Sequence, residues 1–327
     1  MPFLSKKDIE KCVTMPEVID AVKQAFSMAE KGLIDVPLRT VIPTGTGSLL
    51  FMPAYSEVLG LAVLKNVNVI PGNVALGLST TPAGILLIDA KTGYTLAMLD
   101  GTYVTKLRTG AASGAAFDIL ARKHCRKGAL IGTGGQAESQ LDAMLSVRDL
   151  EEVSIFSRTP ERCKMFVDRM CLKYASSGVT LKCADNSDEC IEEADLIITA
   201  TTAEEPVFDG TKVKRGATIS CVGTYEPQKH EIDPELLVRA DKIFCDSKNA
   251  SLSESGDLLI PIRQGLLSGN DILGGLGEVI NGTLQGREND DEIIVFETVG
   301  IAAQDLITSG LIFEKAKHLL ALCPAHR

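Results

Sequence analysis

Hydrophobic positions near the start of the chain follow a helical period and then change to alternation. Between residues 8 and 31 apolar side chains recur at helical spacing, with a break near Met15-Pro16, which predicts an amphipathic helix that restarts there. Strand patterns follow at 39–43, 48–53, 59–69 and 84–89, and the last turns through 90–93 into 94–99. The alternation in 61–69 predicts a sheet with one covered face. A helix is expected at 103–123.

Beyond residue 123 strand and helix patterns alternate along the chain. Strands are expected at 129–131, 153–156, 179–183, 195–199, 217–222, 242–245 and 293–296. Helices are expected at 138–148, 160–175 and 187–193, and a last apolar helix runs from Ile301 towards Leu322. This alternation predicts an α/β fold with a parallel, doubly wound sheet. At 327 residues the chain exceeds the usual size of one core, so two domains are expected.

A glycine-rich turn joins the strand at 129–131 to the next helix. Its sequence is Gly132-Thr133-Gly134-Gly135-Gln136-Ala137. The first glycine permits a tight turn, the second lets backbone N–H groups approach a pyrophosphate, and Ala137 keeps the helix close to the sheet. The pattern predicts a dinucleotide site, although a purely structural turn is the alternative. The stretch Gly274–Gly277 is expected to be a loop and not a second phosphate cradle.

The end of the second strand of such a unit distinguishes the two nicotinamide cofactors. An acidic residue there binds the ribose 2′-hydroxyl of NAD and repels the 2′-phosphate of NADP. This chain has Phe156-Ser157-Arg158-Thr159, which offers a guanidinium and two hydroxyls and no carboxylate. We therefore expect NADPH/NADP to be preferred over NADH/NAD. The alternative is that Ser157 and Thr159 cap the next helix while Arg158 is simply solvated.

Composition and charge disfavour nucleic-acid-binding and membrane-spanning proteins. A formal net charge of −10 disfavours nucleic acid as a partner, and there is no apolar run long enough to span a membrane and no export signal near the N-terminus. The nine cysteines have no C-x-x-C pair, and the four histidines have no metal spacing. We expect a cytoplasmic protein with reduced thiols and no metal.

Three cations in the N-terminal region are candidates for binding an anion. Arg39, Lys65 and Arg108 lie in strand or strand-to-helix settings, where a solvated surface charge is the simpler interpretation of each. Lys65 is different, because apolar residues surround it and an unpaired ammonium in an apolar strand is costly. A bound carboxylate would relieve that cost, and arginine binds carboxylates with two hydrogen bonds.

Several motifs together resemble the ornithine cyclodeaminase/mu-crystallin family, nearly from end to end. They are Pro37-Leu38-Arg39-Thr40, Met52-Pro53, Lys65-Asn66-Val67, Thr81-Pro82-Ala83-Gly84, Leu107-Arg108-Thr109-Gly110-Ala111-Ala112, Gly132–Ala137, Val222-Gly223-Thr224-Tyr225 and Thr298-Val299-Gly300. The resemblance implies a Rossmann domain over 121–300. It also implies a smaller α+β domain for substrate binding and dimerisation, from 1–120 and 301–327, and a homodimer.

The resemblance also implies roles for individual residues. The substrate carboxylate would be bound by Arg39, Lys65, Thr81 and Arg108, with Val299 near the substrate. The cofactor positions that it implies are Gly135, Gln136, Ser157, Thr201, Val222, Lys229 and Thr298. The motif arguments above add Gly132, Gly134, Ala137, Arg158 and Thr159. We expect the three cations to converge opposite the nicotinamide ring.

Two departures from the family pattern narrow the expected reaction. Cyclodeaminases carry an aspartate where this chain has Tyr225 and a glutamate where it has Leu50. A phenol stays protonated at neutral pH, so Tyr225 can donate a proton but is a poor base. We expect hydride transfer from NAD(P)H to a small 2-imino acid, giving an L-amino acid, with Lys65 and Tyr225 as candidate catalytic residues.

Other functions remain open at this stage. The same residues suit an ornithine or lysine cyclodeaminase, or an enzyme like alanine dehydrogenase that acts on an amino acid. A mu-crystallin-like protein that binds a small ligand with NADPH is a second alternative, and a non-catalytic α/β scaffold is a third. The ring size of the substrate and the direction of the reaction do not follow from local sequence.

Overall fold

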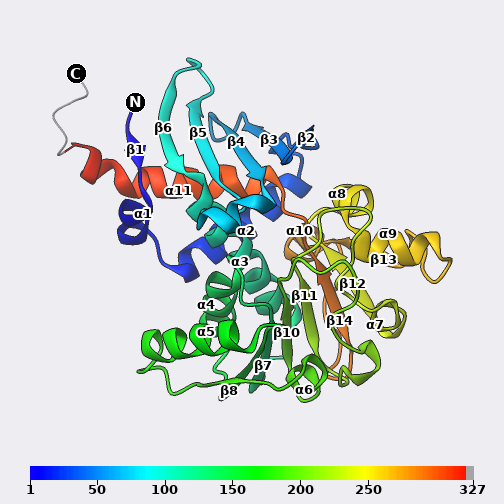
Figure 1. Ribbon diagram of the computed structural model, residues 1–327. Coiled ribbons are helices and arrows are strands. Elements are labelled where there is room, and N and C mark those ends of the chain that lie inside the picture. The colour runs from blue at the N-terminus through cyan, green and yellow to red at the C-terminus, as the bar shows by residue number, and fades with distance from the viewer. Residues whose placement is uncertain (322–327) are drawn as a thin grey trace. The chain divides into compact units, whose positions relative to one another are not determined.

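The computed structural model describes residues 1–321, so Leu322, where the last helix was expected to end, and His326 lie outside the described residues. The chain divides into two compact units (Figure 1). One contains Met1–Arg108 and the chain from Gly300 onward, and the other is Thr109–Val299. The first division falls inside helix α3 (Gly101–Leu120), which belongs to both units in part.

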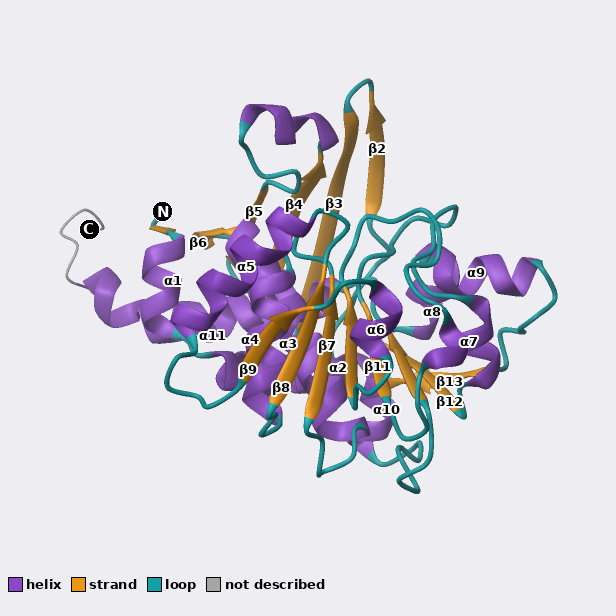
Figure 2. Cartoon of the chain, turned by 60° about the horizontal axis from the view of Figure 1, so that its bottom comes forward, coloured by secondary structure: helices purple, strands orange, loops and turns teal. Residues whose placement is uncertain are grey.

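The first unit is a six-stranded sheet with helices on one face. The sheet order is β1-β6-β5-β4-β3-β2, antiparallel throughout except that β1 runs parallel to β6. The strands are β1 (Phe3–Leu4), β2 (Thr40–Thr44), β3 (Gly47–Ser56), β4 (Leu61–Val69), β5 (Ala83–Asp89) and β6 (Thr95–Asp100). Figure 2 shows β2 and β3 as the two arms of one hairpin.

Helix α11 (Ala302–Ala321) packs against β3, β4 and β5 and against α2 (Met15–Glu30). The predicted alternation is confirmed in β4, where Val63, Lys65 and Val67 are buried and the residues between them are partly exposed. Lys65 therefore lies on the buried face of its strand, between two valines.

The break near Met15-Pro16 separates α1 (Lys6–Cys12) from α2. Proline fits the first turn of a helix, where its missing N–H is not needed. Glu17 accepts a hydrogen bond from the backbone N of Thr14 at 2.9 Å, which satisfies one of the free donors at the helix start. The predicted restart is confirmed, and its cause is local.

The second unit contains an eight-stranded sheet in which every paired strand is parallel. Its order is β13-β12-β14-β11-β10-β7-β8-β9. The strands are β7 (Lys127–Ile131), β8 (Glu152–Phe156), β9 (Thr180–Cys183), β10 (Leu196–Thr199), β11 (Thr218–Cys221), β12 (Lys242–Cys245), β13 (Ile272–Gly275) and β14 (Ile294–Glu297). The helices are α4 (Ala137–Val147), α5 (Pro160–Lys173), α6 (Ser187–Ile191), α7 (Pro234–Arg239), α8 (Lys248–Glu254), α9 (Gly256–Arg263) and α10 (Leu276–Asn281).

Both faces of this sheet are buried. Ala129 and Ile131 of β7 belong to one apolar cluster, whereas Leu130 between them belongs to another. Successive side chains of a strand point to opposite faces, so the two clusters cover opposite sides of the sheet. The predicted doubly wound parallel sheet is confirmed, and Figure 1 shows β10, β11, β14 and β12 side by side within it.

The order of the strands has two features that local patterns did not predict. The chain steps outward from β7 to β8 and β9 and then returns to the other side of β7 with β10, so the order reverses between β7 and β10. The last strand, β14, lies between β11 and β12 rather than at an edge. The reversal matters for function, because parallel sheets bind ligands at such a switch point.

The sequence analysis did not predict several short elements. These are β1, β13, α7, α8, α9, α10 and the 3-10 helices η1 (Pro71–Leu76) and η2 (Gly210–Lys212). The expectation of a loop at Gly274–Gly277 was wrong, since β13 ends there and α10 begins. Glu278 accepts a hydrogen bond from Gly275 N at 2.8 Å, so a side-chain carboxylate already occupies this helix start. It is therefore not a phosphate cradle.

Candidate active site

The glycine turn lies at the switch point of the parallel sheet. Gly132 follows β7 with a φ of +107° and donates its N–H to Phe156 O at 2.9 Å. A Cβ on Gly132 would stand 2.6 Å from Ala200 O, so only glycine fits between the two strand ends. A Cβ on Gly134 would meet no atom within 4 Å, which leaves open space beside the turn. The turn is thus tightly packed at Gly132 and has open space beside its backbone at Gly134.

Helix α4 begins directly after this turn. Ala137, its first residue, is fully buried in the apolar cluster between helix and sheet, as a close helix–sheet contact requires. The N-cap residue Gln136 makes no capping hydrogen bond with its side chain. The first-turn N–H groups of α4 can therefore bind an anion. Gln136 Oε1 is buried and has no hydrogen-bond partner among the described residues, which also fits a polar ligand.

The end of β8 carries the three polar residues expected to distinguish the cofactors. Thr159 is the N-cap residue of α5, but its side chain makes no capping hydrogen bond, and its N–H lies 3.5 Å from Ser157 Oγ. The capping alternative therefore has little support from the geometry. Arg158 is exposed and forms no ion pair within the described part of the chain. All three side chains are available to a ligand.

Two further cofactor candidates follow neighbouring strands, at the same edge of the sheet as the glycine turn. Thr201 lies just after β10, and its N and Oγ1 donate to Glu231 Oε2 at 2.9 and 2.8 Å. Thr298 follows β14, is buried, and donates from Oγ1 to Asp246 Oδ2 at 2.7 Å. Parallel strands bring their carboxyl ends to one edge, which places these residues together.

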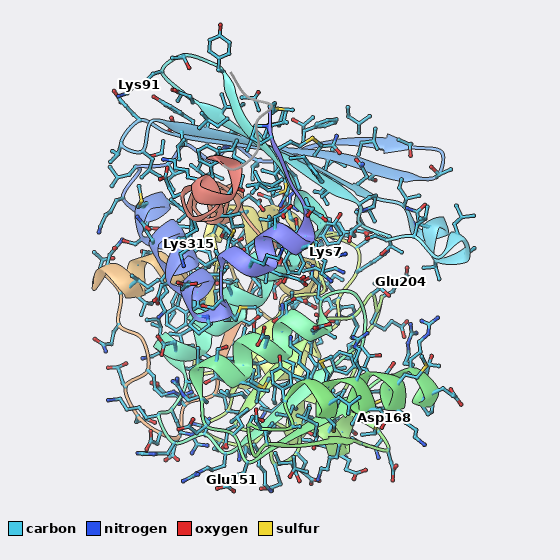
Figure 3. All side chains as sticks on the ribbon, turned by 90° about the vertical axis from the view of Figure 1, so that its left-hand side faces the viewer. Lys7, Lys91, Glu151, Asp168, Glu204 and Lys315 are labelled. Carbon is cyan, nitrogen blue, oxygen red and sulfur yellow. The ribbon has the colours of Figure 1, made fainter. Side chains whose placement is uncertain are left out.

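The other two cofactor candidates lie on the segment after β11. Val222 directly follows β11 and donates its N–H to Thr199 O at 3.0 Å. Lys229 lies further along and pairs with Glu226 at 3.2 Å and with Glu204 at 3.5 Å. Figure 3 labels Glu204, on the loop that follows β10. Lys229 is thus already neutralised by surface carboxylates in this structure.

The first unit brings two of the predicted cations around one carboxylate. Lys65 Nζ lies 2.6 Å from Asp305 Oδ2, and both side chains are fully buried. Arg108 Nε lies 3.3 Å from Asp305 Oδ1, in a geometry that is not a hydrogen bond. Both of these atoms consequently have no hydrogen-bond partner among the described residues. A carboxylate of the chain itself, Asp305 of α11, thus offsets the cost of burying Lys65, a partner that the sequence analysis did not identify.

Gly300 and Gln304 connect the third cation to this group. Arg39 Nη2 donates to Gly300 O at 2.8 Å, and a Cβ on Gly300 would stand 2.4 Å from Arg108 Nη1. Arg108 Nη1 donates to Gln304 Oε1 at 3.0 Å. Gly300 has a φ of +79°, so both its conformation and its surroundings require glycine. We call Arg39, Lys65, Arg108 and Asp305 the cation cluster.

The charge of Lys65 is poorly stabilised in this cluster. Burial, together with the positive charges of Arg108 and Arg39, lowers the pKa of its ammonium to about 7, although Asp305 acts in the opposite direction. With Lys65 protonated, the single negative charge of Asp305 faces two positive charges, those of Lys65 and Arg108. An additional anion would therefore be attracted, and it would favour the protonated form of Lys65.

The other expected site residues are Thr81, Tyr225 and Val299. Thr81 is half-buried and donates its N–H to Ser79 Oγ at 3.2 Å. Tyr225 is half-buried on the segment after β11, and Val299 is buried at the end of the second unit. Asp305, Gln304 and Glu231 are buried polar residues that sequence reasoning missed. Only the polar interruption of an apolar helix, at Gln304-Asp305, gave a signal for the first two.

Two general properties complete the description of the site. In the part of the chain that is described, no group of three or more His, Cys, Asp or Glu side chains is arranged to hold a metal ion. The helices of residues 1–321 include none with the length and apolar character of a membrane span.

A glycine turn at the switch point of a parallel sheet, followed by a helix whose N-cap side chain makes no capping hydrogen bond, defines a Rossmann-type dinucleotide-binding protein. Comparison with known proteins specifies the class. The sequence model of the ornithine cyclodeaminase/mu-crystallin family matches residues 2–319. The chain belongs to this family.

The relatives cover nearly the whole chain. A Δ1-pyrroline-2-carboxylate reductase of Bacillus cereus (strain ZK / E33L) is 37% identical over 318 residues, which are 97% of each protein. The Thermococcus litoralis Δ1-pyrroline-2-carboxylate reductase, solved with NADH and L-proline, has a TM-score of 0.94 and 40% identity, covering 98% of both chains. An archaeal alanine dehydrogenase dimer with bound NAD has a TM-score of 0.91 and 33% identity, covering 98% of this chain and 97% of that one.

The lowered pKa of Lys65 predicts a pH-dependent contribution to stability. Between about pH 7 and 10.5 the unfolded chain holds a proton that folded Lys65 has released, so the free energy of unfolding rises with pH in this window. In Lys65→Met this contribution is absent. The stability of the wild type minus that of Lys65→Met should therefore rise from pH 7 to pH 10, by up to about 1.4 kcal/mol per pH unit.

Urea unfolding at pH 7, 8, 9 and 10 measures this difference. Lys91→Met is the matched control, because Lys91 is exposed on the turn between β5 and β6 (Figure 3). A constant difference between wild type and Lys65→Met across the four pH values would contradict the prediction.

Proposed function

We propose that the chain is an NAD(P)H-dependent oxidoreductase that reduces the C=N bond of a small 2-imino acid to give an L-amino acid. Δ1-Pyrroline-2-carboxylate and Δ1-piperideine-2-carboxylate are the substrates of first choice. The cation cluster is the observation that carries this proposal, because two cations around one buried carboxylate, with Arg39 joined to them through Gly300, suit a substrate carboxylate. Family membership and the relatives named as reductases support the same reaction.

The cation cluster would bind and orient the substrate carboxylate. The Arg39 and Arg108 guanidiniums suit bidentate binding, and Lys65 adds a point charge. Thr81 and Val299 would complete the substrate site. Asp305 keeps Lys65 and Arg108 in place without neutralising both of them. Holding the carboxylate fixes the acceptor carbon in one orientation, which removes much of the entropic cost of reaction.

Reduction of an imine requires a hydride at carbon and a proton at nitrogen. A bound nicotinamide cofactor supplies the hydride from its C4 position. The electrons of the C=N bond move to nitrogen as the new C–H bond forms, and nitrogen then takes a proton. Lys65 suits this step, because its pKa of about 7 makes the ammonium a better acid than an ordinary lysine. The Tyr225 phenol is a second proton donor.

Residues of the second unit would hold the cofactor. The turn Gly132–Ala137 and the start of α4 suit the pyrophosphate, as the tight crossing at Gly132 and the open space at Gly134 indicate. Ser157, Arg158 and Thr159 suit a 2′-phosphate, so we propose that NADPH is preferred and NADH accepted. Thr201, Val222, Lys229 and Thr298 would line the remainder of this site.

An activity screen tests the proposed reaction. Purified protein should oxidise NADPH or NADH in the presence of Δ1-pyrroline-2-carboxylate or Δ1-piperideine-2-carboxylate, followed at 340 nm. Arg39→Met and Arg108→Met should raise the KM for the imino acid by about tenfold or more, because each removes a charge-assisted hydrogen-bond donor. The affinity for the cofactor should change little, since the cation cluster belongs to the first unit.

Arg215→Met removes an arginine paired with Asp241 on the surface of the second unit and should leave both constants unchanged. Absence of turnover with every imino acid would contradict the proposal. Turnover of pyruvate with ammonia in preference to imino acids would instead identify an alanine dehydrogenase, a function favoured by the alanine dehydrogenase structure described above. Ammonia release from ornithine would identify a cyclodeaminase.

Arg158 tests the cofactor preference. Arg158→Ala should raise the KM for NADPH by about tenfold and leave the KM for NADH nearly unchanged, because only NADPH carries the 2′-phosphate. Steady-state kinetics with both cofactors measures the ratio. Equal effects on the two cofactors would show that Arg158 does not contact the 2′-phosphate.

We further propose a homodimer formed through the first unit, and a cytoplasmic location. Val41 and Ile42 on β2 are 49% and 48% exposed, and the sheet order places β2 at an edge. Exposed apolar side chains on an edge strand favour association with a second copy. The related alanine dehydrogenase is described as a dimer. All eight cysteines of the described chain are free thiols, which favours a reducing compartment.

Light scattering with size-exclusion chromatography tests the dimer. The wild type should have twice the mass of the 34.9 kDa chain, and Ile42→Glu should shift the mass towards the monomer, because a buried glutamate is costly. Leu172→Glu is the matched control, since Leu172 is an exposed apolar residue of α5 in the second unit. An unchanged mass for Ile42→Glu would place the interface elsewhere.

A further inference from the structure

Glu231 is a buried carboxylate whose two oxygens accept hydrogen bonds from two different loops. Its Oε2 accepts from the N and Oγ1 of Thr201 at 2.9 and 2.8 Å, on the loop after β10. Its Oε1 accepts from Gly223 N at 2.7 Å, on the segment after β11. The side chain therefore fixes the two strand ends next to the switch point to each other.

These contacts also close the segment from Gly223 to Glu231 into a loop. Gly223 begins it and Glu231 ends it, and it carries Tyr225 and Lys229, two residues of the proposed site. A Cβ on Gly223 would stand 2.5 Å from Glu231 Oε2 and 2.4 Å from Thr201 O, so this junction is tightly packed. The position of the loop thus depends on the Glu231 side chain.

Asp257, at the start of α9, holds the backbone of this junction. Its Oδ1 accepts from the N–H groups of Glu231 and Ile232 at 2.7 and 2.9 Å. A Cβ on the neighbouring Gly256 would stand 1.9 Å from Lys229 O, so α9 begins in direct contact with the loop. Asp257 Oδ2 has no hydrogen-bond partner among the described residues.

Burying the Glu231 and Asp257 carboxylates next to each other lowers the stability of the folded chain. Burial raises the pKa of Glu231, and burial together with the charge of Glu231 raises the pKa of Asp257 to about 7. Neither carboxylate forms an ion pair with a cation within residues 1–321. Buried carboxylates without cations are costly and occur where precise placement of other groups is needed.

We propose that Glu231 is a positioning residue for the dinucleotide site, which fixes Thr201 and the Gly223–Glu231 loop against each other, and that Asp257 positions Glu231. The inference rests on the proposed nucleotide binding. It adds two residues that act through Thr201, Tyr225 and Lys229 and make no contact with the substrate.

Hydrogen-bond counting gives different expectations for the two acids. Glu231 accepts with both oxygens, so the amide of Glu231→Gln can satisfy Thr201 or Gly223 but points an N–H donor at the other. The N–H groups of Glu231 and Ile232 both donate to one oxygen of Asp257, so Asp257→Asn keeps these two bonds, whereas Asp257→Ala loses them. The isosteric change should therefore be harmful at Glu231 and nearly tolerated at Asp257.

Asp195 provides a control carboxylate elsewhere in the second unit; unlike Glu231, it also pairs with Arg122 and, at 2.8 Å, with Lys214. It is also buried and accepts from two backbone N–H groups, Arg126 at 2.6 Å and Lys127 at 3.0 Å. These residues precede or begin β7, at the opposite edge of the sheet from the glycine turn. Asp195→Asn thus damages a buried carboxylate in the same unit without touching the loops that Glu231 joins.

The experiment measures the Kd for NADH and NADPH from the nucleotide fluorescence, together with the unfolding midpoint of each variant. Glu231→Gln should raise the Kd by about tenfold at a temperature where the protein is folded, and Asp257→Ala should do the same. Asp257→Asn should raise it less than about threefold. Asp195→Asn should lower the midpoint but leave the Kd unchanged.

Kinetics separates positioning from general destabilisation. Glu231→Gln should raise the KM for the cofactor more than the KM for the imino acid, whose charge is bound in the first unit. Equal Kd values for wild type, Glu231→Gln and Asp257→Ala would overturn the inference, and so would a Kd shift in Asp195→Asn as large as that in Glu231→Gln. If Glu231→Gln does not fold, the comparison of Asp257→Ala with Asp257→Asn decides. Failure of the wild type to bind either nucleotide would instead overturn the proposed function.

Discussion

The contact between Lys65 and Asp305 determines how a lysine can be buried in the interior of the first unit. A fully buried ammonium is unfavourable, and here a carboxylate from α11 lies 2.6 Å away while Arg108 approaches from another direction. One acid cannot neutralise both of these cations, and burial together with the charges of Arg108 and Arg39 lowers the pKa of Lys65. The protonation of Lys65 and the stability of the first unit thus depend on one charge arrangement.

The second unit also contains buried carboxylates, and some of them bind the loops that follow its parallel strands. Its parallel sheet brings the ends of β7, β10, β11 and β14 to one edge, where several loops must be held close together. Small residues such as Gly132 and Gly223 let the loops approach, and carboxylates such as Glu231 and Asp246 collect their N–H and O–H donors. In the first unit the buried Asp305 balances cations, whereas Glu231 in the second unit accepts its hydrogen bonds from loop backbone and a hydroxyl.

Periodicity predicted most of the fold, because helices and parallel strands leave strong local patterns in the sequence. The short elements between β11 and β14 were missed, since their boundaries depend on side-chain caps such as Asp233, Ser247 and Glu278 rather than on apolar repeats. Lys65 could be found because its apolar neighbours are adjacent in the chain. Asp305 could not, because it lies 240 residues away and meets Lys65 only through the packing of α11 on β4.

The central position of β14 has a consequence for the order in which the chain can assemble. During synthesis from the N-terminus, β12 and β13 emerge before the strand that joins them to β11. Until residues 294–297 leave the ribosome, the position between β11 and β12 is unoccupied, so each of these two strands has an exposed edge. Chaperones protect exposed strand edges of this kind from aggregation. In the same way, the contact between Lys65 and Asp305 can form only after Asp305 has been synthesised. Both halves of the molecule therefore mature late in translation.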